Sequence, residues 1–188
     1  MIFHIPEFSS HVWLTAFECR PADVEATLRA AQKELPDVCV QLVDLSKVAG
    51  SRYLLLACYN ALKSSHSKQP ISRTLSMEIL LYASANRQIS EAVRRVGITE
   101  ATRQIAAIAV GPSSDKVDAA RVYLEKQFGC EGNDSLLDTW SPDRLRAVKD
   151  TFSINQKELS ATLANGEDSV KGIERLAIER SALLTVRK

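Results

Sequence analysis

Two kinds of hydrophobic pattern alternate along the first two thirds of the chain. Short runs of β-branched and aromatic residues are typical of strands, and we expect strands at 1–5, 11–18, 38–45 and 103–111. Elsewhere apolar residues recur every three or four positions, as they do on one face of a helix. We expect these helices at 21–35, 51–65, 75–83, 89–96 and 117–128.

Four residues predict where some of these helices begin and end. Pro21 suits the first turn of its helix, because the missing N–H has no partner there. Ser51 is a candidate N-cap for the next helix. Gly97 and Gly129 follow apolar helices and suit the left-handed position that closes them.

The pattern changes after Gly129. Residues 130–141 have no regular spacing, and Ser141-Pro142 then predicts the start of a helix. Two amphipathic stretches follow, around 159–163 and 170–184. The whole pattern predicts an α+β fold, in which a small mixed or antiparallel β-sheet packs with several α-helices. We expect residues 1–129 to form this domain and residues 130–188 to form a helical C-terminal extension packed on it.

Composition narrows the class of protein. The 188 residues are 45% hydrophobic and 25% charged, as in an ordinary globular protein. No apolar run approaches the roughly 18 residues of a membrane span, and the N-terminus lacks the pattern of a signal peptide. The cysteines have no C-x-x-C spacing and are predicted to be reduced core residues; they are Cys19, Cys39, Cys58 and Cys130. We therefore expect a cytoplasmic protein with no membrane partner.

Charge is concentrated in the central third. The net charge of the chain is +1, but residues 52–103 hold eight basic and three acidic residues and so carry +5. The rest of the chain is therefore −4. Such a concentration is compatible with an anionic partner. Charge alone favours the simpler interpretation, a solvated helix surface.

Catalytic constellations are missing from the sequence. The three histidines have no ligand spacing, and no nucleotide-binding glycine loop or G-x-S-x-G motif occurs. The turn at Gly111 could face a phosphate, yet Ser113 or Ser114 suffices there as an N-cap. Glu78 lies in an apolar helix face, and we interpret it as an ion-pair partner that orders the basic segment. We therefore predict no enzyme activity, no cofactor and no metal.

The basic third has features beyond its charge. Three consecutive helix ends place long cationic and amide side chains where they could line one edge, among them Lys63, Arg73, Arg87, Gln88 and Arg94. Such groups suit phosphates and the edges of unpaired bases. Small residues at Ser84 and Ala85 would let RNA come close. Tyr82 could stack on a base, although its helical spacing favours the core.

One long segment of the basic third resembles a known family. It combines Ser72-Arg73-Thr74-Leu75, Glu78-Ile79-Leu80, Arg87-Gln88-Ile89-Ser90-Glu91-Ala92 and Gly97-Ile98. This constellation resembles the smallest core subunit of the KEOPS complex, the kinase-binding TPRKB family. The basic elbow resembles archaeal members more than the mammalian one.

The resemblance implies a non-catalytic subunit. Members of the family bind the small kinase-like ATPase of KEOPS, and so join the assembly that adds threonylcarbamoyl to adenosine 37 of tRNA. They reach the threonylcarbamoyl transferase subunit indirectly. The resemblance also implies capture of the single-stranded 3′ CCA end of tRNA. We predict that this end contacts Lys63, Arg73, Ser84, Arg87, Gln88 and Arg94.

Other hypotheses stay open at this point. The main alternative is a kinase-regulating interaction protein without intrinsic RNA binding. A small-molecule enzyme that uses Glu78 and the Gly111 turn is the least supported. For kinase docking, the candidates are the C-terminal helices and the exposed face of the helix at 24–35, because a single sequence does not separate a partner-facing stripe from a core-facing one.

Overall fold

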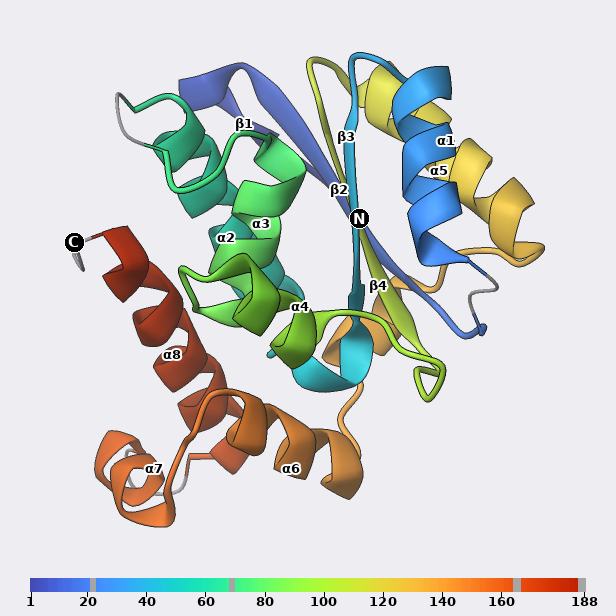
Figure 1. The fold of residues 1–188 in the computed structure, drawn as a ribbon. Coiled ribbons are helices and arrows are strands. Elements are labelled where there is room, and N and C mark those ends of the chain that lie inside the picture. Colours follow the sequence, from blue (N-terminus) through green and yellow to red (C-terminus); the bar gives the residue numbers. More distant parts are fainter. Residues whose placement is uncertain (21–22, 68–69, 164–166, 186–188) are drawn as a thin grey trace.

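A four-stranded sheet organises the molecule (Figure 1). The computed structural model describes residues 1–20, 23–67, 70–163 and 167–185. The strands are β1 (Ile2–Ile5), β2 (Ser10–Phe17), β3 (Cys39–Asp44) and β4 (Ile105–Gly111). They lie in the order β1-β2-β4-β3, and every neighbouring pair is antiparallel. The predicted α+β class is confirmed, and the sheet is the antiparallel one of the two expected kinds.

Helices cover both faces of the sheet (Figure 1). On one face lie α1 (Val24–Glu34) and α5 (Ser114–Phe128). On the other lie α2 (Ser51–Ser65), α3 (Leu75–Ser84) and α4 (Ile89–Val96). The chain then continues through α6 (Pro142–Thr151), α7 (Gln156–Thr162) and α8 (Ser169–Ala182). Because both faces are covered, all seven residues of β4 are buried, which explains its uninterrupted apolar sequence.

Two apolar cores result from the alternation of side chains along the strands. Trp13 and Phe17 of β2 point to the α1–α5 side, whereas Val12 and Leu14 point to the α2–α3 side. The core on the α2–α3 side is the larger of the two, and it includes Leu176 and other side chains of α8. The C-terminal helices thus help to enclose the same core as the helices of the basic third.

The first two predicted helix starts need correction. Asp23 caps α1 by accepting a hydrogen bond from the N–H of Ala26, and Pro21 lies outside the described residues. Gly50, with φ of 100°, is the N-cap of α2, so Ser51 is the first residue inside the helix. The N–H and hydroxyl of Ser51 donate to the carboxylate of Asp138, at 2.8 and 2.6 Å. The carboxylate of Asp138 therefore caps the start of α2, which is the role that the sequence predicted for the side chain of Ser51.

Other helix ends follow the predicted chemistry. Ser113 caps α5, Ser141-Pro142 opens α6, and Gly129 closes α5 with φ of 66°. Gly97 does end α4, but in an extended conformation with φ of −66°. The reason for glycine there is space, since a Cβ would lie 2.2 Å from the carbonyl oxygen of Val93.

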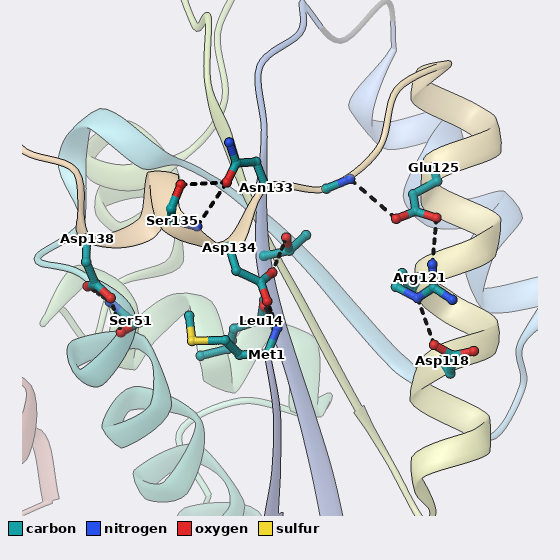
Figure 2. Close-up of polar contacts among 12 residues, drawn as sticks. Met1, Leu14, Ser51, Asp118, Arg121, Glu125, Asn133, Asp134, Ser135 and Asp138 are labelled. Carbon is teal, nitrogen blue, oxygen red and sulfur yellow. Dashed lines mark hydrogen bonds and ion pairs between the residues drawn. The ribbon is translucent and has the colours of Figure 1, made fainter.

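The segment after α5 is tied to the sheet by polar contacts (Figure 2). The N–H of Asn133 donates to the carbonyl of Ala16 at 2.7 Å, and Thr15 Oγ1 donates to Asp134 at 2.6 Å. The amino group of Met1 also meets the Asp134 carboxylate. These contacts attach residues 133 and 134 to the sheet, and α8 side chains lie in the same core as α2 and α3. The division at residue 129 stays a prediction.

The remaining composition-based predictions concern cysteines, metals and membranes. All four cysteines are free thiols, and burial raises the pKa of Cys39 to about 12, which keeps that thiol protonated at neutral pH. Within the described residues, no group of three His, Cys, Asp or Glu side chains could hold a metal ion. No helix in the described part of the chain is long and apolar enough to span a bilayer.

Candidate functional site

The elbow between α3 and α4 is built as a tight helix end. Ala85 has φ of 50°, in the left-handed region that residues other than glycine seldom adopt. The N–H of Ala85 donates to Tyr82, and the N–H of Asn86 donates to Leu81. Asn86 Oδ1 then accepts from the N–H of Gln88 at 2.9 Å. The elbow therefore has a defined conformation, held by hydrogen bonds among its own residues and the end of α3.

Ser84 and Tyr82 belong to the core and not to an RNA-facing surface. Ser84 is 0% exposed, and its hydroxyl donates to the carbonyl of Leu81 at 2.9 Å. Tyr82 is buried as well, and its carbonyl accepts from the hydroxyls of Tyr53 and Ser181. The predicted contact between Ser84 and tRNA therefore does not fit its position. Tyr82 is the core residue that its spacing favoured.

Arg87 links the elbow to the end of the chain. Its side chain is exposed over much of its surface, but Nη1 donates to the carbonyl of Leu184 at 2.9 Å. Gln88, the next residue, is exposed and forms the N-cap position of α4. A substitution at Arg87 would thus disturb the packing of the turn that follows α8, Leu183–Thr185, as well as any ligand contact.

The other predicted cations lie at different places on the surface. Lys63, in the last turn of α2, and Arg73, just before α3, are both exposed. The ten residues of α3, about 15 Å long, separate this end from the elbow. Arg94 is exposed on α4 and pairs with Glu91 at 2.6 Å. The predicted edge is thus divided between the two ends of α3.

Several cations of the basic third serve the fold. Arg95 donates to the carbonyl of Thr151, and Arg103 donates to the carbonyls of Glu100 and Thr102. Lys68 lies outside the described residues. The +5 charge of this segment is unchanged by these bonds to neutral carbonyls, but fewer of its N–H donors are available to a ligand.

Glu78 orders the approach to α3 through hydrogen bonds. It is fully buried, and its carboxylate accepts from the N–H groups of Ile71 and Ser72 at 3.2 and 2.7 Å. The Ser72 hydroxyl adds a third bond at 2.7 Å. The sequence predicted that Glu78 forms an ion pair. In the structure its carboxylate instead accepts hydrogen bonds from the loop that carries Arg73. Glu78 therefore has a positioning role.

An apolar pair on α4 was not anticipated. Ile89 and Val93 are one turn apart, and each is 49% exposed. Ala92 and Val96 of the same helix are buried in the core. In sequence these four residues form one continuous helical stripe, so spacing alone predicts that all of them face inward. The structure instead leaves half of the stripe in solvent, beside Gln88 and Arg94.

Comparison with known proteins identifies the family to which the chain belongs. Residues 21–185 match the model of the family described as "Kinase binding protein CGI-121". The chain belongs to this kinase-binding family. The resemblance predicted from the central third is therefore confirmed, and the match includes the C-terminal helices, which the sequence pattern had not connected to any family.

Two relatives share part of the sequence, and one of them is named as a subunit of a complex. The chain is 28% identical over 76 residues to a Yarrowia lipolytica protein named EKC/KEOPS complex subunit CGI121, a match that spans 40% of this chain and 45% of the relative. It is 28% identical over 114 residues to the regulatory protein Cgi121 of Methanocaldococcus jannaschii, spanning 61% and 70%. The fungal and archaeal identities are equal, so the archaeal character of the elbow stays a prediction.

Proposed function

We propose that this protein is a non-catalytic KEOPS subunit that binds the KEOPS kinase and recruits tRNA by its 3′ CCA end for modification of adenosine 37. The observation that carries the proposal is the exposed apolar pair on α4, in a chain whose family is described as kinase-binding. Exposed aliphatic side chains at the centre of a polar surface are the usual core of a protein interface. The family match and the surface thus support the same kind of partner.

We place the kinase contact on α4. Its Ile89 and Val93 supply an apolar centre, and Gln88 and Arg94 supply a polar rim. A stable interface buries about 800 Å² on each partner, so elements beside α4 must take part. The sequence proposed two other surfaces, the C-terminal helices and the exposed face of the helix at 24–35. Because α8 uses its apolar residues inside the core, we favour α4 over the C-terminal helices, and the exposed face of α1 stays a prediction.

Val93→Glu is expected to weaken kinase binding by about a hundredfold. A buried charge at the centre of an interface costs on the order of 2–3 kcal/mol, and each 1.4 kcal/mol is a tenfold change in Kd. Val122→Glu is the matched control, because Val122 is 53% exposed on α5, across the sheet. Isothermal titration with the kinase from the same genome measures both variants. Equal affinity of the two variants would refute the α4 assignment.

We place tRNA on the cations at the two ends of α3. Lys63 and Arg73 lie at one end, Arg87 and Gln88 lie at the elbow, and Arg94 follows on α4. The separation of about 15 Å suits several unpaired nucleotides, whose phosphates would meet one cationic end after the other. Ser84 is left out of this interface because it is buried.

Arg73→Glu is expected to weaken tRNA binding about tenfold near 0.1 M salt and to reduce the salt dependence of Kd, because fewer phosphates are neutralised. Arg29→Glu on α1 is the control, since Arg29 is also exposed and pairs only loosely with Glu25, at 3.6 Å. Filter binding with intact tRNA and with tRNA trimmed of its CCA end measures the effect. Equal binding of the two tRNAs would rule out recognition of the 3′ end.

The alternative function is kinase regulation without intrinsic RNA binding. One observation favours it: Arg94, Arg95 and Arg103 already have partners within the chain. This alternative predicts unchanged kinase affinity together with tRNA binding no stronger than that of an unrelated protein of similar charge. The same two titrations therefore separate the two functions.

A further inference from the structure

The outer edge of β3 presents main-chain groups that no other strand of the described sheet pairs. β3 is the last strand of the described sheet and pairs only with β4. The N–H of Leu45 donates to the carbonyl of Gln104 on the β4 side. In an antiparallel ladder successive residues alternate in direction, so Val40 and Leu42 direct their N–H and C=O groups away from β4. The β3 edge, meaning these outward groups of Val40 and Leu42, thus has the geometry of a template for another strand.

A side chain of the same strand now occupies part of this edge. The outward N–H of Leu42 donates to Oε1 of Gln41, its neighbour, at 3.2 Å. Gln41 is only 5% exposed, so its amide is held close to the main chain. Because the side-chain amide is chemically equivalent to a peptide group, it fills the place that the carbonyl of an added strand would take.

The β3 edge lies on the floor of a groove. A cavity of about 930 Å³ runs along it, between a wall formed by α1 and a wall formed by α3 and the end of α4. Figure 1 shows β3 between these helices, with no further strand beside it. Val24 and Leu28 line the first wall, and Leu75 lines the second. Ile98 also lines the groove and packs against the core on the α1 side. The groove is within the range of about 300–1,000 Å³ that is usual for ligand sites.

The charges around the groove compensate each other. Glu25 pairs with Arg29 on α1, and Asp37 pairs with Lys116 at the end near the start of α5. The groove therefore offers main-chain hydrogen bonds and apolar walls, without a surplus of cations for phosphates. These features match the backbone and side chains of an uncharged extended peptide, in which alternate side chains point to the two walls.

We propose that the β3 edge binds an uncharged, extended peptide segment of a partner protein by strand addition. The peptide pairs with the main chain of Val40 and Leu42 and displaces the Gln41 amide. This site does not rest on the proposed function, because it uses neither the cations at the two ends of α3 nor Ile89. Val93 lies where the groove meets the α4 surface, so the experiment uses substitutions on β3 alone.

The first test uses random octapeptides displayed on phage and selected against the full chain. The strongest peptide is synthesised, and its binding is measured by fluorescence anisotropy. We expect N-methylation of alternate residues to weaken binding at least tenfold and methylation of the intervening residues to have little effect, because only every second N–H faces β3. Absence of any enriched peptide, or equal effects at all positions, would overturn the proposal.

Two substitutions on β3 are expected to act in opposite directions. Val40→Pro removes an outward N–H and keeps the bonds to β4, so peptide binding falls at least tenfold. Gln41→Leu frees the N–H of Leu42, so the same peptide binds several-fold more tightly, as the loss of one competing hydrogen bond implies. Urea unfolding shows whether each variant is folded, and the methylated peptides test the wild-type chain whatever the result for Val40→Pro. Weaker binding by folded Gln41→Leu would contradict strand addition.

Two other occupants are measured in the same experiment. An ACCA oligonucleotide is added to the complex of the wild-type chain with the peptide. If it displaces the peptide, and if methylation of alternate residues has no distinct effect, the groove binds RNA. A dimer in sedimentation that Val40→Pro dissociates would show that the edge pairs with a second copy of the chain. Either outcome would overturn the proposal.

Discussion

Arg144→Met is expected to lower the free energy of unfolding by about 3–5 kcal/mol, the largest effect of any single substitution considered for this protein. Arg144 is 5% exposed, and its guanidinium lies 4.7 Å from the ring centroid of Trp140. Its two terminal nitrogens donate to four carbonyl groups, those of Val48, Leu136, Leu137 and Thr139. The methionine would remove the guanidinium donor from all four oxygens, of which that of Leu136 would keep the N–H of Thr139 at 3.3 Å.

The position of Arg144 explains why the cost is high. The carbonyl of Val48 precedes α2, whereas the other three belong to the segment between α5 and α6. One side chain thus joins the segment between α5 and α6 to the residues that precede α2. Burial lowers the pKa of Arg144 to about 10, so the guanidinium stays protonated at neutral pH and continues to donate.

Urea unfolding followed by circular dichroism measures this effect. The matched control is Arg146→Met on the same helix, because Arg146 is exposed and pairs with Asp143 at 3.4 Å. Exposed ion pairs contribute little, so we expect a change below about 0.5 kcal/mol for the control. A loss below about 1 kcal/mol for Arg144→Met would show that water replaces the guanidinium at little cost.

Glu78→Gln is expected to lower the free energy of unfolding by about 2–3 kcal/mol, because hydrogen bonds to a buried carboxylate are charge-assisted. The amide keeps the volume of the side chain, but its NH₂ group faces donors where an acceptor is needed. The donors are the N–H groups of Ile71 and Ser72 and the hydroxyl of Ser72. The loop before α3 should therefore loosen together with Arg73, which it carries.

Hydrogen exchange separates this local effect from a general loss of stability. The amides of Ile71 and Ser72 should exchange faster in Glu78→Gln than the change in global unfolding accounts for. Glu91→Gln is the control, since Glu91 is partly exposed on α4 and pairs with Arg94. We expect it to leave the loop unchanged. Unaltered exchange at Ile71 and Ser72 in Glu78→Gln would contradict the positioning role.

Local chemistry predicted much of the fold. The unbroken apolar run of β4 indicated a strand covered on both faces, and Ser113 and Gly129 marked the two ends of α5. These features depend on residues that are close together in sequence, so a single sequence is enough to predict them. The same holds for Ser141-Pro142 at the start of α6.

Partners distant in sequence were not predictable in this way. Arg144 lies in a polar helical stretch that is typical of a solvated surface, and only the folded chain brings the carbonyl of Val48 to it. Asp138 caps α2 from 87 residues away, so Ser51 was the better candidate by local rules. Hydrogen bonds between residues that are far apart in sequence cannot be predicted from the spacing of hydrophobic residues.

The candidate site shows the same limit. Ser84 is polar and lies next to a turn, which is typical of a surface residue, yet its hydroxyl is satisfied inside its own helix. Ile89 and Val93 continue a stripe whose other members are buried, so their exposure was not predictable from spacing. The exposed cations were found from the sequence, but their division between the two ends of α3 needed the structure.

Titration of the wild-type protein with the purified KEOPS kinase from the same genome tests the central claim most directly. Calorimetry should detect a complex of one protein to one kinase, with a Kd in the micromolar range or tighter, as a specific interface of standard size implies. The negative heat-capacity change that accompanies burial of apolar surface should appear when the titration is repeated at several temperatures. Absence of binding at protein concentrations of about 100 μM would contradict the assignment of this chain as a kinase-binding subunit.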